Sequence, residues 1–235
     1  MAEQLICNQQ VIGSSPIEGS KKKKSMKLLT RIANLCETDK GTVVGEGHGY
    51  TEFYEDFFRK YNGKNINILE IGVFNGGSLK MYNTYFDEKC TIYALDIENK
   101  EEYNKENIKT FICNQGKRED LEEFKKSIGN IKFDIIIDDG SHLPWDQMLS
   151  FYYLHDLLKE DGLYIIEDLH SWSWNGMENS VLYSLMFTKP FVFLSTEESE
   201  ILHSRINTVQ IWLKNNDRAL SAPQKTSITS VITMK

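Results

Sequence analysis

INILEIGVFNGGS, residues 66–78, is a nearly continuous apolar run that passes directly into a glycine-rich turn. An apolar run of this kind is typical of a strand that is buried on both faces of a sheet. Glycines allow the backbone to turn tightly and to approach a ligand at the start of the following helix. The stretch therefore predicts the first strand of a parallel α/β sheet, with a ligand site beyond its carboxyl end.

The same alternation of apolar and amphipathic segments continues along the chain. Apolar segments predict further strands at 91–95, 108–113, 133–137 and 162–166, and helices are predicted at 78–86, 118–128 and 148–158. Shorter segments around 191–194, 201–203 and 209–213 predict strands with short connections at the far edge. We expect an α/β fold with a Rossmann-like, doubly wound sheet of seven mostly parallel strands and an antiparallel C-terminal edge.

The two ends of the chain are expected to lie outside this sheet, which occupies residues 63–215. Residues 26–62 contain aromatic side chains at helical spacing and predict a helical cap, whose aromatic stripe we interpret as packing. Residues 1–25 have no periodicity and predict a disordered leader, either a solvated basic segment or translated upstream sequence before a start at Met26. Residues 216–235 are expected to form a C-terminal tail.

Composition limits the kinds of partner that the protein binds. The 235 residues carry 27 Lys and Arg against 34 Asp and Glu, a net charge of -7, which argues against a nucleic-acid partner. The longest apolar runs are far shorter than the roughly 20 residues that cross a bilayer, so no membrane span is predicted. The four cysteines show no CxxC spacing, and residues 1–25 lack the features of an export signal. We therefore expect a cytoplasmic protein without a disulfide framework.

The first turn indicates which cofactor the sheet binds. A dinucleotide site requires the spacing G-x-G-x-x-G, whereas here Glu70 and Gly72 precede a second glycine at Gly76. An acid on the strand suits a cationic amino or sulfonium group and would repel a pyrophosphate. Asp96 ends the second strand, where an acid can bind both ribose hydroxyls, although an acid there can also cap a loop. The pattern favours S-adenosylmethionine.

Acidic residues follow two neighbouring strands. One strand ends in Asp138 and Asp139, and the next runs into Glu167 and Asp168. Parallel neighbours lie about 4.8 Å apart, so these clusters should face each other, and converging carboxylates repel unless a cation lies among them. Oxygen ligands suit Mg²⁺ or Mn²⁺, while the alternative is that the acids only cap helices.

Histidines near these acids are candidates for moving a proton. His142 lies three residues past Asp139, within reach of a substrate held there, and an imidazole suits proton removal from a hydroxyl. His170 is a second candidate. Trp145, Trp172 and Trp174 lie on segments that would cover the cleft, where they would stack on a sugar or simply pack.

Three motifs together resemble one group of class I S-adenosylmethionine methyltransferases, which includes the metal-dependent macrolide-sugar O-methyltransferases and methyltransferases of polysaccharide clusters. The motifs are EIGVFNGGS at 70–78, IIIDDGSH at 135–142 and IIEDLHSWSW at 165–174, supported by TDKG at 38–41 and HGY at 48–50. The resemblance covers about residues 28–213 and makes 63–215 the methyltransferase domain. The chain is shorter than the macrolide enzymes, so the acceptor and the oligomeric arrangement do not carry over, and a homo-oligomer stays open.

The resemblance also implies a role for individual residues. It implies metal ligands at Asp139, Glu167 and Asp168, a general base at His142, and cofactor contacts at Glu70, Gly72, Asp96 and Gln115. Tyr50 is expected to contact the cofactor or the substrate from the cap, and Gly76 is a further expected cofactor contact because it lies in the turn after the first strand. The expected reaction is Mg²⁺-dependent methylation of a hydroxyl on a sugar or glycosylated small molecule, with S-adenosylmethionine as methyl donor. Two alternatives remain at this point: an NAD(P)-dependent oxidoreductase, and a non-catalytic binding protein that keeps the fold.

Overall fold

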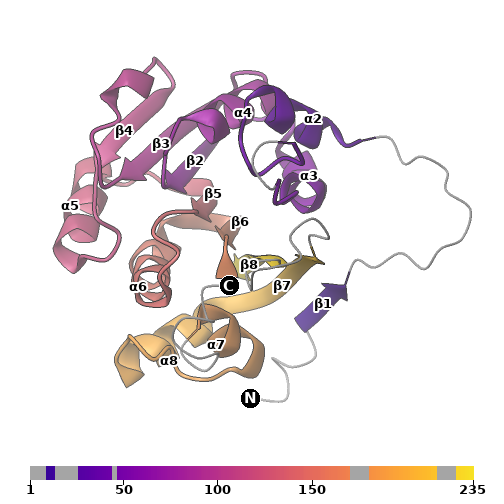
Figure 1. Cartoon of the computed structure of the whole chain (residues 1–235). Coiled ribbons are helices and arrows are strands. Elements are labelled where there is room, and N and C mark those ends of the chain that lie inside the picture. Colours follow the sequence, from indigo (N-terminus) through magenta and orange to yellow (C-terminus); the bar gives the residue numbers. More distant parts are fainter. Residues whose placement is uncertain (1–8, 14–25, 44–46, 170–179, 216–225) are drawn as a thin grey trace, which may run out of the picture.

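The computed structural model describes residues 9–13, 26–43, 47–169, 180–215 and 226–235, and its centre is one mixed sheet (Figure 1). The strand order is β1-β7-β8-β6-β5-β2-β3-β4. The strands are β1 (Gln9–Gly13), β2 (Ile66–Ile71), β3 (Cys90–Asp96), β4 (Ile108–Ile112), β5 (Phe133–Asp138), β6 (Leu158–Ile166), β7 (Ile206–Asn215) and β8 (Thr226–Met234). All neighbours pair in parallel except β8, which is antiparallel to both β6 and β7.

The expected sheet is thus confirmed, with two refinements. The seven strands β2–β8 form the mostly parallel sheet, and β1 adds an eighth strand beside β7. The antiparallel strand lies inside the sheet, because β8 inserts between β6 and β7, while β7 itself runs parallel to β6.

The apolar strands are buried on both faces, as the sequence predicts. Successive side chains of a strand point to opposite faces. Ile68 of β2 therefore belongs to one hydrophobic cluster and its neighbour Leu69 to the other. The face of Leu69 is covered by the helices α5 (Arg118–Ile128), α6 (Pro144–Leu154), α7 (Val181–Phe187) and α8 (Thr196–Arg205) (Figure 1). The face of Ile68 is covered by α2 (Leu28–Leu35), α3 (Thr51–Phe58) and α4 (Gly77–Tyr85). Three short 3₁₀ helices complete the elements: η1 (Arg59–Tyr61), η2 (Glu101–Tyr103) and η3 (His155–Leu157).

The aromatic stripe of the cap packs against the sheet, as expected. Tyr54 and Phe58 of α3 are fully buried, and Phe53 stacks on Trp212 of β7 with ring centroids 6.2 Å apart. Large buried rings of this kind contribute substantially to a core. The cap is therefore fixed on one face of the sheet, over β7 and β8, and residues 38–43 and 47–50 lie at the ends of the strands.

Four expectations about the terminal parts of the chain are wrong. Residues 226–234 of the expected tail form β8, whose Ile232 is fully buried between two strands. Residues 196–205 form α8 rather than a strand at 201–203, because Ser195 and Glu198 make a capping box that starts a helix. Residues 191–194 lie in the turn before α8. Within the expected leader, residues 9–13 form β1, paired with Val209–Leu213 of β7.

No helix within the described ranges is long and apolar enough to cross a membrane.

Candidate active site

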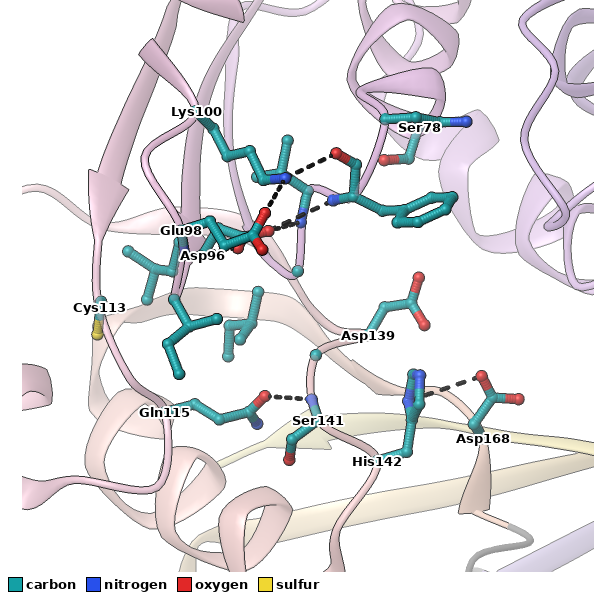
Figure 2. A pocket seen from close by; sticks show the side chains of 18 of the residues that line it. Ser78, Asp96, Glu98, Lys100, Cys113, Gln115, Asp139, Ser141, His142 and Asp168 are labelled. Atoms are coloured by element: carbon teal, nitrogen blue, oxygen red, sulfur yellow. Dashed lines mark hydrogen bonds and ion pairs between the residues drawn. The ribbon is translucent and has the colours of Figure 1, made fainter.

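A pocket of about 840 Å³ opens at the carboxyl ends of β2, β3 and β5 (Figure 2). Ligands of open α/β sheets bind at this edge. Its walls come from the loops after these strands and from the cap loop: Thr38, Lys40, Gly72, Phe74, Ser78, Asp96, Glu98, Gln115, Asp139, Ser141, His142 and Asp168. Asp96, Glu98 and Lys100 lie together at one end, and Asp139, His142 and Asp168 lie together at the other (Figure 2). We refer to these as the β3 end and the acid end.

Gly72 allows two loops to cross closely at the centre of the pocket. Its φ is +91°, and a Cβ at this position would lie 2.1 Å from the carbonyl oxygen of Asp139. A side chain at position 72 would therefore push the β5 loop away. The glycine of the strand–turn motif thus acts by bringing the Asp139 loop against the end of β2.

At the β3 end, Asp96 ties two loops together while it lines the pocket. Its Oδ2 accepts hydrogen bonds from the backbone N–H of Val73 at 2.9 Å and of Phe74 at 3.3 Å. Its Oδ1 accepts one from the N–H of Glu98 at 2.9 Å. The capping role and the ligand-facing position that the sequence leaves as alternatives therefore occur together.

Gln115 lines the pocket, but its amide is already committed. Its Nε2 donates to Asp138 Oδ1 at 3.0 Å, and its Oε1 accepts from the N–H of Ser141 at 2.7 Å. Asp138 points away from the acid end, because consecutive residues alternate across a strand, and Ser150 also donates to it. Burial raises the pKa of Asp138 to about 6, against the hydrogen bonds from Ser150 and Gln115. Gln115 and Asp138 therefore brace the loop that carries Asp139 and His142.

Three expected cofactor contacts lie outside the pocket wall. Glu70 is fully buried behind it, where Ser78 Oγ donates to its Oε2 at 2.7 Å, and burial raises its pKa to about 7. Gly76 caps α4 with φ +69° and faces the ring of Tyr103. Tyr50 is buried under the acid end. The structure does not bring these three residues to the pocket surface, because Glu70 and Tyr50 are buried and Gly76 caps α4.

The acid end gathers two of the expected metal ligands with the expected base. Asp139, His142 and Asp168 each offer one ligand atom, and these atoms lie within 4.8 Å of one another. His142 Nδ1 is 3.7 Å from Asp168 Oδ2 (Figure 2). Both His142 and Asp168 have positive φ, at +58° and +53°. Non-glycine residues in this region are uncommon and cluster at functional sites.

Glu167, the third expected ligand, faces the interior and meets a lysine of the cap. Its Oε2 accepts a hydrogen bond from Lys40 Nζ at 2.9 Å, and Lys40 also donates to Asp139 Oδ2. Burial, and then the Asp139 charge, raise the pKa of Glu167 well above its usual range. Burial also raises the pKa of Asp139, while Lys40 opposes this shift. Lys40 belongs to the TDKG motif at 38–41, and its contacts with these carboxylates were not predicted from the sequence.

The cap also brings Tyr50 to the acid end, where it contacts the third carboxylate, that of Asp168. Its hydroxyl donates to Asp168 Oδ1 at 2.6 Å, and its ring stacks on His48 at 5.1 Å. Burial, followed by the Asp168 charge, raises the tyrosine pKa well above its usual value, so the hydroxyl stays a neutral donor. Tyr50 thus orients Asp168.

The donors at the acid end fit a hard divalent cation. Carboxylate oxygens are the ligands that Mg²⁺ prefers. Glu167 Oε1 and His142 Nδ1 are buried side-chain atoms without a hydrogen-bond partner among the described residues. Buried polar atoms are nearly always satisfied, so two such atoms beside two carboxylates fit an ion or bound substrate at this point.

Three of the candidate residues, His170, Trp172 and Trp174, lie outside the described residues. Trp145 lies on α6, where its ring meets Phe193 edge to face with centroids 5.7 Å apart.

Comparison with known proteins gives sugar O-methyltransferases as relatives, while no protein-family model matches. Demethylmacrocin O-methyltransferase of Streptomyces fradiae is 37% identical over 139 residues, which are 56% of this chain and 34% of that protein. The 8-demethyl-8-alpha-L-rhamnosyl tetracenomycin-C 2'-O-methyltransferase of Streptomyces olivaceus is 32% identical over 57% of this chain and 36% of its own length.

Among solved structures, the chain is similar to the MycE methyltransferase of the mycinamycin pathway, determined in complex with Mg, SAH and mycinamycin VI. The TM-score is 0.65 at 25% identity, over 89% of this chain and 55% of that one. The chain thus spans about a third of the curated relatives and about half of that structure. The expected resemblance is confirmed, and the sheet is that of a Rossmann-like methyltransferase fold.

Proposed function

We propose that the protein is an S-adenosylmethionine-dependent O-methyltransferase that acts on a hydroxyl of a sugar or glycosylated small molecule and uses Mg²⁺. One observation carries the proposal: a single pocket joins the β3 end, with Asp96, to the acid end, with Asp139, His142 and Asp168. Relatives that methylate sugar hydroxyls support the acceptor class, and the MycE complex with Mg and SAH supports both cofactors.

The β3 end suits the nucleoside of the methyl donor. Asp96 lines the pocket with a carboxylate whose remaining lone pairs can accept from ribose hydroxyls. The exposed side chains of Phe74 and Ile97, which also line the pocket, offer apolar surface to the nucleobase. Glu70 would act from behind the wall, by fixing Ser78, which does line the pocket.

The acid end suits the acceptor hydroxyl. Asp139 and Asp168 would hold the divalent ion together with Glu167, through the Oε1 that has no hydrogen-bond partner within the described ranges. The ion, when bound, lowers the pKa of a coordinated hydroxyl and orients it. His142 would accept the hydroxyl proton, and its contact with Asp168 orients the imidazole for this task. Tyr50 holds Asp168 in position from the cap. Holding donor and acceptor in one pocket provides much of the rate acceleration.

The proposal extends to points that rest on the sequence alone. We place the protein in the cytoplasm and its acceptor in polysaccharide or glycoside biosynthesis; Mn²⁺ would replace Mg²⁺ at the same oxygen ligands. The net charge of -7 argues against a nucleic-acid acceptor. The two alternatives, an NAD(P)-dependent oxidoreductase and a non-catalytic binding protein, are less well supported, since the relatives transfer methyl groups.

Calorimetric titration with S-adenosylhomocysteine and with NADH tests the cofactor. We expect binding of the first and none of the second. Transfer of a radioactive methyl group from S-adenosylmethionine to a panel of 6-deoxyhexosides, with and without EDTA, then tests the reaction. Transfer that needs Mg²⁺ supports the full proposal. NADH binding, or no binding of S-adenosylhomocysteine, refutes it, and transfer in excess EDTA removes the metal from it.

A further inference from the structure

Lys40 is the buried positive charge of the acid end. Its side chain is only 1% exposed, and its Nζ meets carboxylates that follow or belong to three different strands. It donates to Asp139 Oδ2 after β5 and to Glu167 Oε2 after β6 at 2.9 Å, and it lies 3.8 Å from Glu70 Oε1 on β2. A buried cation at such a junction neutralises charges that would otherwise repel one another.

The cap holds Lys40 in this place through its backbone. The carbonyl oxygen of Lys40 accepts from both the N–H and the hydroxyl of Thr51 at the start of α3, each at 3.1 Å. The amine of a lysine is protonated at neutral pH, and the two carboxylates that accept hydrogen bonds from Lys40 Nζ stabilise this charged form. The cation is therefore a fixed part of the site.

Two of its partners are the carboxylates that would bind the divalent ion. Asp139 contributes to the metal-type cluster with His142 and Asp168, and Glu167 keeps one buried oxygen that has no hydrogen-bond partner in the part of the chain that the structure describes. An ammonium that already holds both carboxylates opposes a second cation by repulsion and by occupying their lone pairs. The Coulomb interaction is strong here because the side chains of Lys40 and Glu167 are each only 1% exposed to solvent.

We propose that Lys40 is a positioning residue that acts as the internal counter-cation of the acid end: it holds Asp139 and Glu167 in place without metal, and it competes with the divalent ion for them. The competition rests on the metal site of the proposed function, whereas the stabilising role does not. The lysine therefore limits metal affinity in exchange for a stable metal-free fold.

Manganese titration followed by electron paramagnetic resonance, without cofactor or acceptor, measures the competition. Lys40→Met should bind Mn²⁺ about tenfold more tightly than the wild type, since the competing charge is gone. A lysine that merely scaffolds the ligands predicts the opposite, because its loss would leave them disordered. Unchanged or weaker Mn²⁺ binding by Lys40→Met overturns the proposal.

Thermal unfolding in EDTA measures the stabilising role. Removing one partner of a buried ion pair is strongly destabilising, so Lys40→Met should melt about 10 °C lower than the wild type, and Mn²⁺ should raise its melting temperature more than that of the wild type. Lys159→Met is the matched control, because Lys159 pairs with Asp134 at the opposite end of β5, Nζ to Oδ2 2.7 Å. It should leave Mn²⁺ affinity unchanged.

A second variant keeps the test decisive if Lys40→Met does not fold. Lys40→Met/Glu70→Gln removes one positive and one negative charge and keeps Asp139, Glu167 and Asp168. It should therefore fold, and it should bind Mn²⁺ more tightly than Glu70→Gln alone; failure to fold, or equal or weaker Mn²⁺ binding, overturns the proposal. If neither the wild type nor these variants bind Mn²⁺, the competition is refuted together with the metal of the proposed function, while S-adenosylhomocysteine binding still judges the cofactor.

Discussion

The two ends of the pocket are built in different ways. At the β3 end, Asp96 accepts hydrogen bonds from the backbone N–H groups of residues 73, 74 and 98, each of which lies within 23 positions of Asp96 along the chain. At the acid end, Lys40 reaches Glu167 across 127 positions and Tyr50 reaches Asp168 across 118. One end is thus assembled by neighbouring loops of the sheet, and the other by a cap docked onto it.

The two ends also differ in how fully their polar groups are satisfied. Both oxygens of Asp96 accept backbone hydrogen bonds, whereas Glu167 Oε1 and His142 Nδ1 are buried without a hydrogen-bond partner among the described residues. A buried polar group without a hydrogen-bond partner lowers stability, so such groups are rare and indicate a functional role. Under the proposed function, this difference favours cofactor binding at the β3 end and chemistry at the acid end.

Replacing Asp168 should give the largest effect and the sharpest test of this division. Asp168→Ala removes a proposed metal ligand, and a metal contributes several kcal/mol to the transition state. We expect kcat to fall about 10⁴-fold in methyl-transfer assays. The affinity for S-adenosylhomocysteine, measured by calorimetry, should stay within about twofold.

Equal losses of turnover and of cofactor affinity in Asp168→Ala would break the division between the two ends. Circular dichroism on the same sample controls for folding, because the variant also frees the hydroxyl of Tyr50.

His142 should have the next largest effect. A positioned general base contributes about 10²–10⁴-fold, so His142→Ala should lower kcat about 10³-fold with little change in cofactor affinity. Added imidazole should restore part of the rate, since the side chain leaves a space at the pocket wall. Near-normal turnover would show that another group takes the proton; a parallel His170→Ala variant then decides whether His170 is that group.

The sequence allowed the central sheet and the strand-end residues to be predicted for a physical reason. Strands buried on both faces need continuous apolar runs, and parallel strands end at the same edge of the sheet. Asp96, Asp139 and Asp168 could therefore be assigned to that edge from the sequence alone. Helix α8 could also have been predicted from the sequence. Ser195 and Glu198 show the spacing of a capping box, a local signal that outweighs the apolar residues at 201–203.

Other features depend on long-range packing and left no local signal. A lysine in a loop is ordinarily exposed, so the burial of Lys40 follows only from where the cap docks. That Asp138 turns away while Asp139 faces the pocket requires the register of β5. Strand β8 is rich in the β-branched residues Thr, Ile and Val, which favour a strand, but its insertion between β6 and β7 is set by the whole sheet.

At the β3 end, Asp96 should affect binding rather than turnover. Asp96→Ala removes the charged acceptor that we propose for the ribose hydroxyls, and hydrogen bonds to charged groups contribute about 1.5–3 kcal/mol. We expect S-adenosylhomocysteine to bind about 10–100-fold more weakly, while kcat at saturating S-adenosylmethionine changes less than threefold. A fall in kcat as large as that of His142→Ala would contradict the assignment of binding to this end.

The smallest effect is expected at the edge strand β1, far from both ends of the pocket. Deleting residues 1–25 removes the five-residue pairing of Gln9–Gly13 with β7. Each hydrogen bond contributes about 0.5–1.5 kcal/mol, but fixing each residue costs about 1–2 kcal/mol of entropy, so the two terms nearly cancel. The melting temperature should therefore fall by no more than about 4 °C, and the affinity for S-adenosylhomocysteine should not change. A larger fall would show that β1 also packs against the core, and a change in cofactor affinity would show that this edge of the sheet is coupled to the pocket.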